Sequence, residues 1–174
     1  MNRLIGPLMI VLLLTPLYGS DVSVFAGFDD VRTLTTEVGR LQFDNFNIFG
    51  VRFEKDFGVI FGFENTLGVS PGSFLTQAGE DIGGLYYTAN LVINLPIRRT
   101  LPFVTWGLGL AHKSGQSFPD TGTKFVTNWG AGIKIRRVAG PLGLRVEYRR
   151  FTFRDVVEES LRINEFSAGL MFTF

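Results

Sequence analysis

Cysteine is absent from this chain of 174 residues, and histidine occurs only once, as His112. Without cysteine there is no disulfide scaffold, no thiol nucleophile and no cysteine metal site. A single histidine also argues against a histidine-rich metal centre. We therefore predict that the protein uses no cofactor and no metal.

The N-terminal segment MNRLIGPLMIVLLLTPLYGS predicts a secretory signal peptide. Arg3 supplies a positive charge, an apolar stretch follows it, and the small residues Gly19 and Ser20 mark a cleavage site. The apolar stretch is shorter than the about 20 residues of a transmembrane helix, although an uncleaved N-terminal anchor is the alternative. We expect residues 1–20 to be the signal peptide and residues 21–174 to form one domain.

A large charge of either sign is missing as well. The chain has 17 Lys and Arg against 16 Asp and Glu, so the loss of Arg3 with the signal peptide leaves a formally neutral domain. A neutral surface argues against nucleic acid as a partner.

Long apolar runs are absent after the signal peptide, yet 45% of the residues are hydrophobic and 18 are Phe. Apolar content of this kind meets a membrane as strands rather than helices. Segments with a period of two recur between turn-rich stretches. We predict strands over residues 22–28, 46–55, 58–68, 84–95, 103–113, 124–137, 142–153 and 161–174. Most are about ten residues long, as tilted bilayer-crossing strands are.

The connections between these segments alternate in length. Those after the second, fourth and sixth strands are short, whereas the others are longer and polar, for example DDVRTLTTEVGRLQFDN and SGQSFPDTGT. Short periplasmic turns and long outer loops are typical of bacterial outer-membrane barrels. The predicted fold is therefore all-β, an eight-stranded antiparallel up-and-down transmembrane β-barrel.

Alternation alone does not say which face of the strands lies inside. A soluble periplasmic, lipocalin-like binding barrel would place the apolar face inward. The inverted arrangement is favoured because the polar face is rich in glycine, and because aromatic residues such as Trp106, Tyr148 and Phe174 lie near strand ends, as interfacial girdles require. Phe174 would be exposed to water in a soluble barrel but suits a lipid interface.

The inward face then carries charges of both signs. The predicted lumen network consists of Arg52, Glu54, Glu64, Lys134, Arg136, Arg145, Glu147, Arg149 and Glu165. About eight strands enclose only enough room for side chains, so these charges are interpreted as a salt-bridged plug. A narrow porin-like path for ions or small solutes is the alternative, and alternation does not separate the two.

The glycines of WGLGLA and WGAGIK sit inside predicted strands, and no helix follows them. They therefore lack the context that a phosphate-binding loop needs. We interpret them as space for bulky side chains in the lumen.

Several segments resemble a known family. PFVTWGLGLAH, NWGAGIKI, GLRVEYRRFTF and the final NEFSAGLMFTF are similar to strands of the small eight-stranded outer-membrane β-barrel proteins, the OmpA/OmpX-like group, and the resemblance spans residues 21–174. It implies a bacterial outer-membrane location, contact with outer-membrane lipid and lipopolysaccharide, and a structural or surface-interaction role without enzymatic activity. It also implies that the last strand is the signal read by the barrel-assembly machinery, through Phe166, Leu170, Phe172 and Phe174. It identifies no surface ligand.

One enzymatic alternative concerns His112 and Ser114, on the outward face of a predicted strand. Some small outer-membrane barrels are lipid A deacylases with a Ser–His–acid arrangement. No acid is placed beside this pair, and residues two apart on a strand are about 7 Å apart. In that family the His–Ser motif lies on the penultimate strand, which here reads EYRRFTFRD. We therefore interpret His112 as an ordinary residue at a loop edge.

Overall fold

The computed structural model describes residues 20–31, 34–36, 39–41, 46–70, 83–114, 122–153 and 161–174. The predicted signal peptide lies outside these residues, apart from Ser20. The strands are β1 (Ser20–Val31), β2 (Leu34–Thr36), β3 (Gly39–Leu41), β4 (Phe46–Phe57), β5 (Phe61–Ser70), β6 (Gly83–Asn94), β7 (Thr100–Ser114), β8 (Thr123–Ala139), β9 (Leu142–Phe153) and β10 (Leu161–Thr173). Among the described segments, none is a helix long and apolar enough to cross a membrane.

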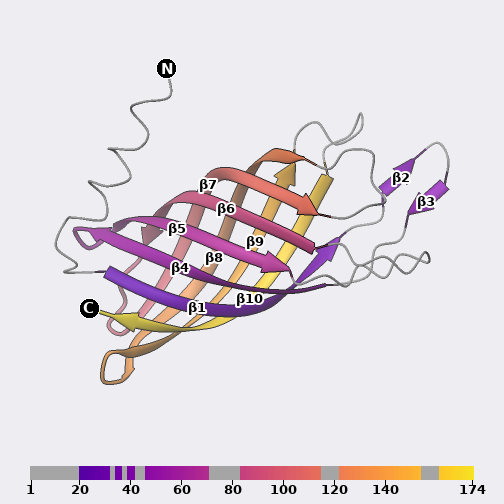
Figure 1. Cartoon of the computed structure of the whole chain (residues 1–174). Coiled ribbons are helices and arrows are strands. Elements are labelled where there is room, and N and C mark those ends of the chain that lie inside the picture. The colour runs from indigo at the N-terminus through magenta and orange to yellow at the C-terminus, as the bar shows by residue number, and fades with distance from the viewer. Residues whose placement is uncertain are drawn as a thin grey trace.

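Eight of these strands form one closed antiparallel barrel (Figure 1). The neighbours follow the order β1-β10-β9-β8-β7-β6-β5-β4, and the ring closes because β1 pairs with both β10 and β4. At one end of this seam, the Phe174 N–H donates to the Ser20 carbonyl at 3.0 Å. The predicted eight-stranded antiparallel fold is confirmed.

Three short turns lie at the same end of the barrel as this seam contact. The first covers residues 58–60 and begins with Gly58 at φ +74°, and the last contains Gly140 at φ +61°. Both angles lie in the left-handed region that favours glycine. The predicted start of the third strand at Gly58 was wrong, because β5 begins at Phe61. Val59 and Ile60 extend the apolar pattern of the strand in the sequence, but both lie exposed in the turn.

The longest connection carries a small hairpin of its own. The three-residue strands β2 and β3 pair antiparallel, with Leu34 opposite Leu41. This whole connection was predicted to be a loop, because strands of three residues are too short to show a period of two.

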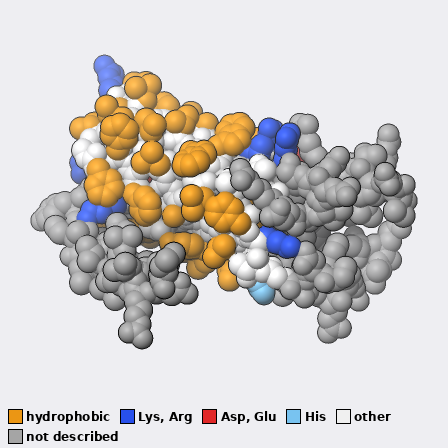
Figure 2. Space-filling view, turned by 90° about the horizontal axis from the view of Figure 1, so that it is seen from above, with side chains coloured by type: hydrophobic (Ala, Val, Ile, Leu, Met, Phe, Trp, Pro, Cys, Tyr) orange, Lys and Arg blue, Asp and Glu red, His pale blue; other side chains and the backbone are white. Residues whose placement is uncertain are grey.

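Burial alternates along most of the length of the barrel strands, with Ile163, Asn164 and Glu165 on β10 as a run of three buried residues. On β5, Glu64 and Thr66 are fully buried, whereas Phe61 and Leu67 are about half exposed at 51% and 45%. Figure 2 shows the result: hydrophobic side chains cover the middle of the visible face, and Lys and Arg lie at its two margins. The lipocalin-like alternative, with an apolar interior, is therefore wrong for this chain.

Some inward-facing glycines make room for large side chains in the interior. A Cβ added at Gly132 would lie 2.7 Å from the ring of Phe103, and one at Gly107 would collide with the side-chain amide of Asn90. Phe103 and Asn90 are themselves buried. The interpretation of these glycines as space for lumen side chains is confirmed.

Candidate functional site: the charged interior of the barrel

The interior of the barrel holds a compact set of buried charges. Eight of the nine charges assigned to the lumen from the sequence are at most 4% exposed. They are Arg52, Glu54, Glu64, Lys134, Arg145, Glu147, Arg149 and Glu165. Four are basic and four are acidic, so their formal charges cancel. Burial of charge is tolerable only when each ion is paired and hydrogen-bonded.

The centre of this set is a row on β9. Arg145, Glu147 and Arg149 alternate with outward-facing residues, so the strand period of two brings all three to the inside. Arg145 Nη2 donates to Glu147 Oε2 at 2.8 Å, and Arg149 Nη2 donates to Glu147 Oε1 at 2.6 Å. One carboxylate is thus held between two guanidinium groups.

The same two arginines reach across the lumen to β5. Arg149 Nη2 donates to Glu64 Oε1 at 2.8 Å, and Arg145 Nη1 lies 2.6 Å from Glu64 Oε2. Thr66 and Asn90 also donate to Glu64 Oε1, at 2.9 and 3.1 Å. Since β9 and β5 are four steps apart in the ring of eight, these ion pairs join opposite walls.

A second cross-lumen pair lies nearer the short turns. Lys134 Nζ on β8 donates to Glu54 Oε1 on β4 at 2.5 Å, and also to Asn94 Oδ1 at 2.8 Å. Arg145 Nη1 approaches the other oxygen of Glu54 at 3.3 Å. The ring of Phe103 lies 4.7 Å from Lys134 Nζ and 4.4 Å from the Arg145 guanidinium carbon, so cation–π contacts add to the pairing.

Towards the long connections the network continues through Arg52 and Glu165. Arg52 Nη2 donates to Glu165 Oε1 at 2.9 Å and to Ser167 Oγ at 3.0 Å. The guanidinium carbon of Arg52 lies 3.5 Å from the centre of the Phe25 ring. The Tyr86 hydroxyl donates to Glu165 Oε2 at 2.6 Å. Glu165 therefore has partners on both of its oxygens.

Arg136, the ninth predicted residue, lies apart from this set at the end with the short turns. It pairs with Asp21 Oδ2 and with Asp56 Oδ2, both at 2.5 Å, and its side chain is 21% exposed. Asp21 and Asp56 were missed in the sequence because the predicted first strand began at Val22, and Asp56 was assigned to a turn. Their inward parity on extended strands would have identified them.

Polar uncharged residues of the interior also belong to the network, although the predicted network named only charged residues. Tyr86, Asn90 and Asn94 alternate along β6 with apolar residues, and their inward parity was the available signal. Within the described residues, no group of three or more His, Cys, Asp or Glu side chains is arranged to hold a metal ion.

His112 is placed at the outer end of β7 and faces outward. Its Nδ1 lies 3.3 Å from the hydroxyl of Thr123 on the neighbouring strand. Ser114, the other half of the enzymatic alternative, ends the same strand, and its side chain lies outside the described set. Both residues therefore lie on the same strand, two positions apart, which is a spacing of about 7 Å along an extended strand.

The four residues assigned to the assembly signal all face outward. Phe166, Leu170, Phe172 and Phe174 are between 39% and 57% exposed. The rings of Phe172 and Phe174 contact each other edge to face, with centroids 4.9 Å apart. These side chains form an apolar row along β10 that begins beside the short turns.

An apolar outer belt around a charged interior defines a transmembrane β-barrel. A family model for the outer membrane protein beta-barrel domain matches residues 19–174. The chain belongs to this family, and it is an integral protein of the bacterial outer membrane. No curated protein sequence matches it significantly.

Solved barrels share the fold. Neisserial surface protein A has 15% identity and a TM-score of 0.71, covering 90% of this chain and 97% of its own. Ail, the attachment invasion locus protein of Yersinia pestis, has 15% identity and a TM-score of 0.55, with 89% and 99% covered. The outer membrane enzyme PagL has 15% identity and a TM-score of 0.54, with 88% and 99% covered. At these identities the likeness is one of fold alone, and the set includes an enzyme.

Proposed function

We propose that the protein is a non-conducting outer-membrane barrel that acts as a rigid platform for its long connections at the cell surface. The observation that carries this proposal is the pairing of buried charges from opposite walls, Lys134 with Glu54 and Arg149 with Glu64. Side chains that meet across the lumen occupy the space that a solute would need.

The chemistry of the interior supports a plug rather than a selective pore. Selective pores expose a ring of charges or dipoles of one kind to the passing ion. Here acidic and basic groups alternate in direct contact, as in Arg145–Glu147–Arg149. Their charges are satisfied by each other, so an entering ion finds no unpaired partner among them and must break an existing ion pair.

The arrangement of the connections supports a role at the surface. The connections after β1, β5, β7 and β9 all leave from the end opposite the short turns, because consecutive barrel strands are antiparallel. Loops held by a rigid scaffold are common binding elements. Ail is named the attachment invasion locus protein, and we propose a comparable interaction role for this chain.

Conductance in planar lipid bilayers tests the plug. We expect the refolded wild type to insert without stepwise conductance. The double variant Glu64→Ala with Arg149→Ala removes one cross-lumen pair and its bulk, so we expect it to produce small, frequent openings. Val146→Ala is the matched control, because it shortens an exposed, lipid-facing side chain on the same strand as Arg149. Stable unitary steps in the wild type would instead establish the narrow channel.

The proposal includes no enzymatic activity at His112. Incubation of the refolded protein with purified lipid A, followed by mass spectrometry, should show no loss of acyl chains. If acyl chains are released by the wild type and not by His112→Ala, the enzymatic alternative replaces this part of the proposal.

A further inference from the structure

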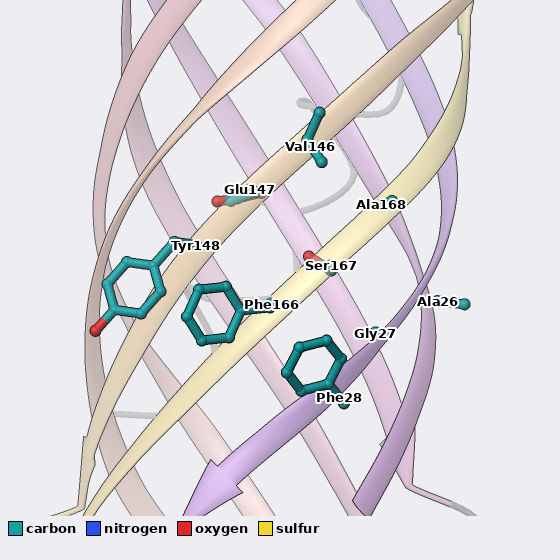
Figure 3. Close-up of a pocket in the computed structure, with 9 residues that line it drawn as sticks. All are labelled: Ala26, Gly27, Phe28, Val146, Glu147, Tyr148, Phe166, Ser167 and Ala168. Carbon is teal, nitrogen blue, oxygen red and sulfur yellow. The ribbon is translucent and has the colours of Figure 1, made fainter.

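A groove lies on the lipid-facing surface between β1, β10 and β9. Its volume is about 390 Å³, and Figure 3 shows the residues that line it. Ala26 of β1 is opposite Ala168 of β10, and Val146 of β9 continues the same row. Most of the outward-facing positions nearby carry large apolar side chains, so two adjacent alanines leave a depression in the belt.

Three aromatic rings form the wall of this groove nearer the long connections. Phe28, Phe166 and Tyr148 are opposite one another on β1, β10 and β9, one outward-facing position beyond the row of the two alanines. The ring centroids of Phe28 and Phe166 are 5.4 Å apart, and those of Phe166 and Tyr148 are 4.9 Å apart. Figure 3 shows the three rings side by side. Because each ring packs on the next, the wall is formed before any ligand arrives.

A fixed guanidinium lies one outward-facing position beyond the rings. Arg150 Nε donates to Asn164 Oδ1 at 2.9 Å, and the Tyr148 hydroxyl donates to the same oxygen at 2.8 Å. The Arg150 guanidinium also lies over the Trp129 ring, 5.5 Å from its centre. Neither contact occupies the two terminal nitrogens of Arg150. Arg162, exposed on β10, lies one position further out.

The charges at this level favour an anion on the β9 side. Among the described residues of β1, β9 and β10, the outward-facing carboxylate at this level is Asp30, which lies on β1, two strands from Arg150. A guanidinium above an apolar groove matches a lipid whose phosphate sits above its acyl chains, since Arg binds phosphate in a bidentate manner. The long connections mark the outer side of the membrane, where the lipid is lipopolysaccharide.

We propose that this groove is a specific site for the lipid A part of lipopolysaccharide. One acyl chain lies over Ala26 and Ala168, and a phosphate binds Arg150, with Arg162 as a second cation. The site is on the outer wall of the barrel and does not depend on whether the lumen conducts.

Native mass spectrometry of the refolded protein in detergent micelles, titrated with diphosphoryl lipid A, tests the site. We expect saturable binding of one molecule. Arg150→Gln removes the phosphate contact, and the loss of one charge-assisted contact should weaken binding by about tenfold or more. Ala168→Leu fills the groove that the acyl chain would occupy, and we expect a loss of affinity of the same order, about tenfold. Ala26→Leu is a second groove variant. The gel shift between boiled and unboiled samples verifies that each variant is folded.

Two matched controls isolate the site. Ala89→Leu makes the same exchange on the lipid-facing side of β6, and Arg99→Gln removes an exposed cation at the opposite rim. Both should bind lipid A as the wild type does. Dephosphorylated lipid A should bind more weakly and lose its dependence on Arg150. Equal affinity of both groove variants and the wild type, or equally tight binding of phosphatidylglycerol, would overturn the proposal.

Discussion

Lys134 and Glu54 meet across the lumen, with Nζ and Oε1 2.5 Å apart, although they belong to strands on opposite walls. Both side chains are at most 1% exposed. Each of these two charged groups therefore relies on the other, and on neighbours such as Asn94 and Arg145, for the hydrogen bonds that water would otherwise provide.

Removing one member of this pair should destabilise the barrel strongly. Within the described residues, Lys134→Met leaves the buried Glu54 carboxylate with Arg145 as its one cationic partner. Removing one member of a buried ion pair costs about 3–5 kcal/mol. The double variant with Glu54→Gln should recover a large part of this loss, because neither charge remains. Urea unfolding in detergent micelles, followed by tryptophan fluorescence, measures the free energy of unfolding. Arg99→Ala, at an exposed turn residue, should change it by less than about 0.5 kcal/mol. Single variants as stable as this control would refute a structural role for the pair.

Gly68 should not accept a side chain. A Cβ at this position would press into the Tyr86 ring, whose hydroxyl oxygen would be 2.7 Å away. Gly68→Ala should therefore lower the urea midpoint and weaken the Tyr86–Glu165 hydrogen bond. Gly84→Ala is the control, because its Cβ would meet nothing within 4 Å. The loss should be smaller in a Tyr86→Leu background, and equal effects at the two glycines would contradict this account.

The outward row on β10 should matter for assembly in cells. Phe174→Ala removes one ring of the Phe172–Phe174 contact, and we expect a lower fraction of folded protein in outer-membrane extracts. That fraction is the band that migrates faster on an SDS gel without boiling. Phe57→Ala serves as the comparison, since Phe57 is also aromatic, 51% exposed and next to a short turn. Identical losses for Phe174→Ala and Phe57→Ala would mean that Phe174 contributes only membrane contact.

Export should remove the N-terminal segment. We expect the intact mass of protein purified from outer membranes to correspond to a chain that starts at Ser20 or Asp21. Ser20 is the first residue of β1, and its carbonyl accepts the Phe174 N–H. A chain that starts at Ser20 keeps this hydrogen bond, whereas one that starts at Asp21 loses it but keeps the pairing of Asp21 with Thr173. A mass that includes Arg3 would show that the segment is retained as an anchor.

The barrel strands were predictable because their signal is local. A period of two places Arg145, Glu147 and Arg149 on one face of their strand, independently of which strands lie beside it. The composition of the two faces, one polar and rich in glycine and the other apolar and aromatic, then indicates which face is inside. Strand ends were less certain, since the apolar pattern runs through Val59 and Ile60 into a turn whose geometry depends on Gly58.

The pairing of the charges was not predictable in the same way. Glu54 and Lys134 are 80 residues apart, and Arg52 and Glu165 are 113 apart. Which carboxylate meets which cation depends on strand register and on closure of the ring, and neither is recorded in the alternation of one segment. Asp21 and Asp56 are a different case, because they share the inward parity of their strands and were missed only because the predicted strands stopped short of them.

The cross-lumen pairs tie loss of water from the interior to the last step of barrel formation. In an open sheet, strands four positions apart are separated by roughly 19 Å at the usual inter-strand spacing, so Glu54 and Lys134 cannot touch. They come together only when β1 joins β10 and the sheet curls into a ring. Until then each charge needs its own hydration, and an unclosed sheet inside the membrane would hold unpaired ions. Pairing of β1 with β10 and loss of water from the lumen are therefore one cooperative event. In a barrel that has not closed, the cross-lumen ion pairs contribute little to stability.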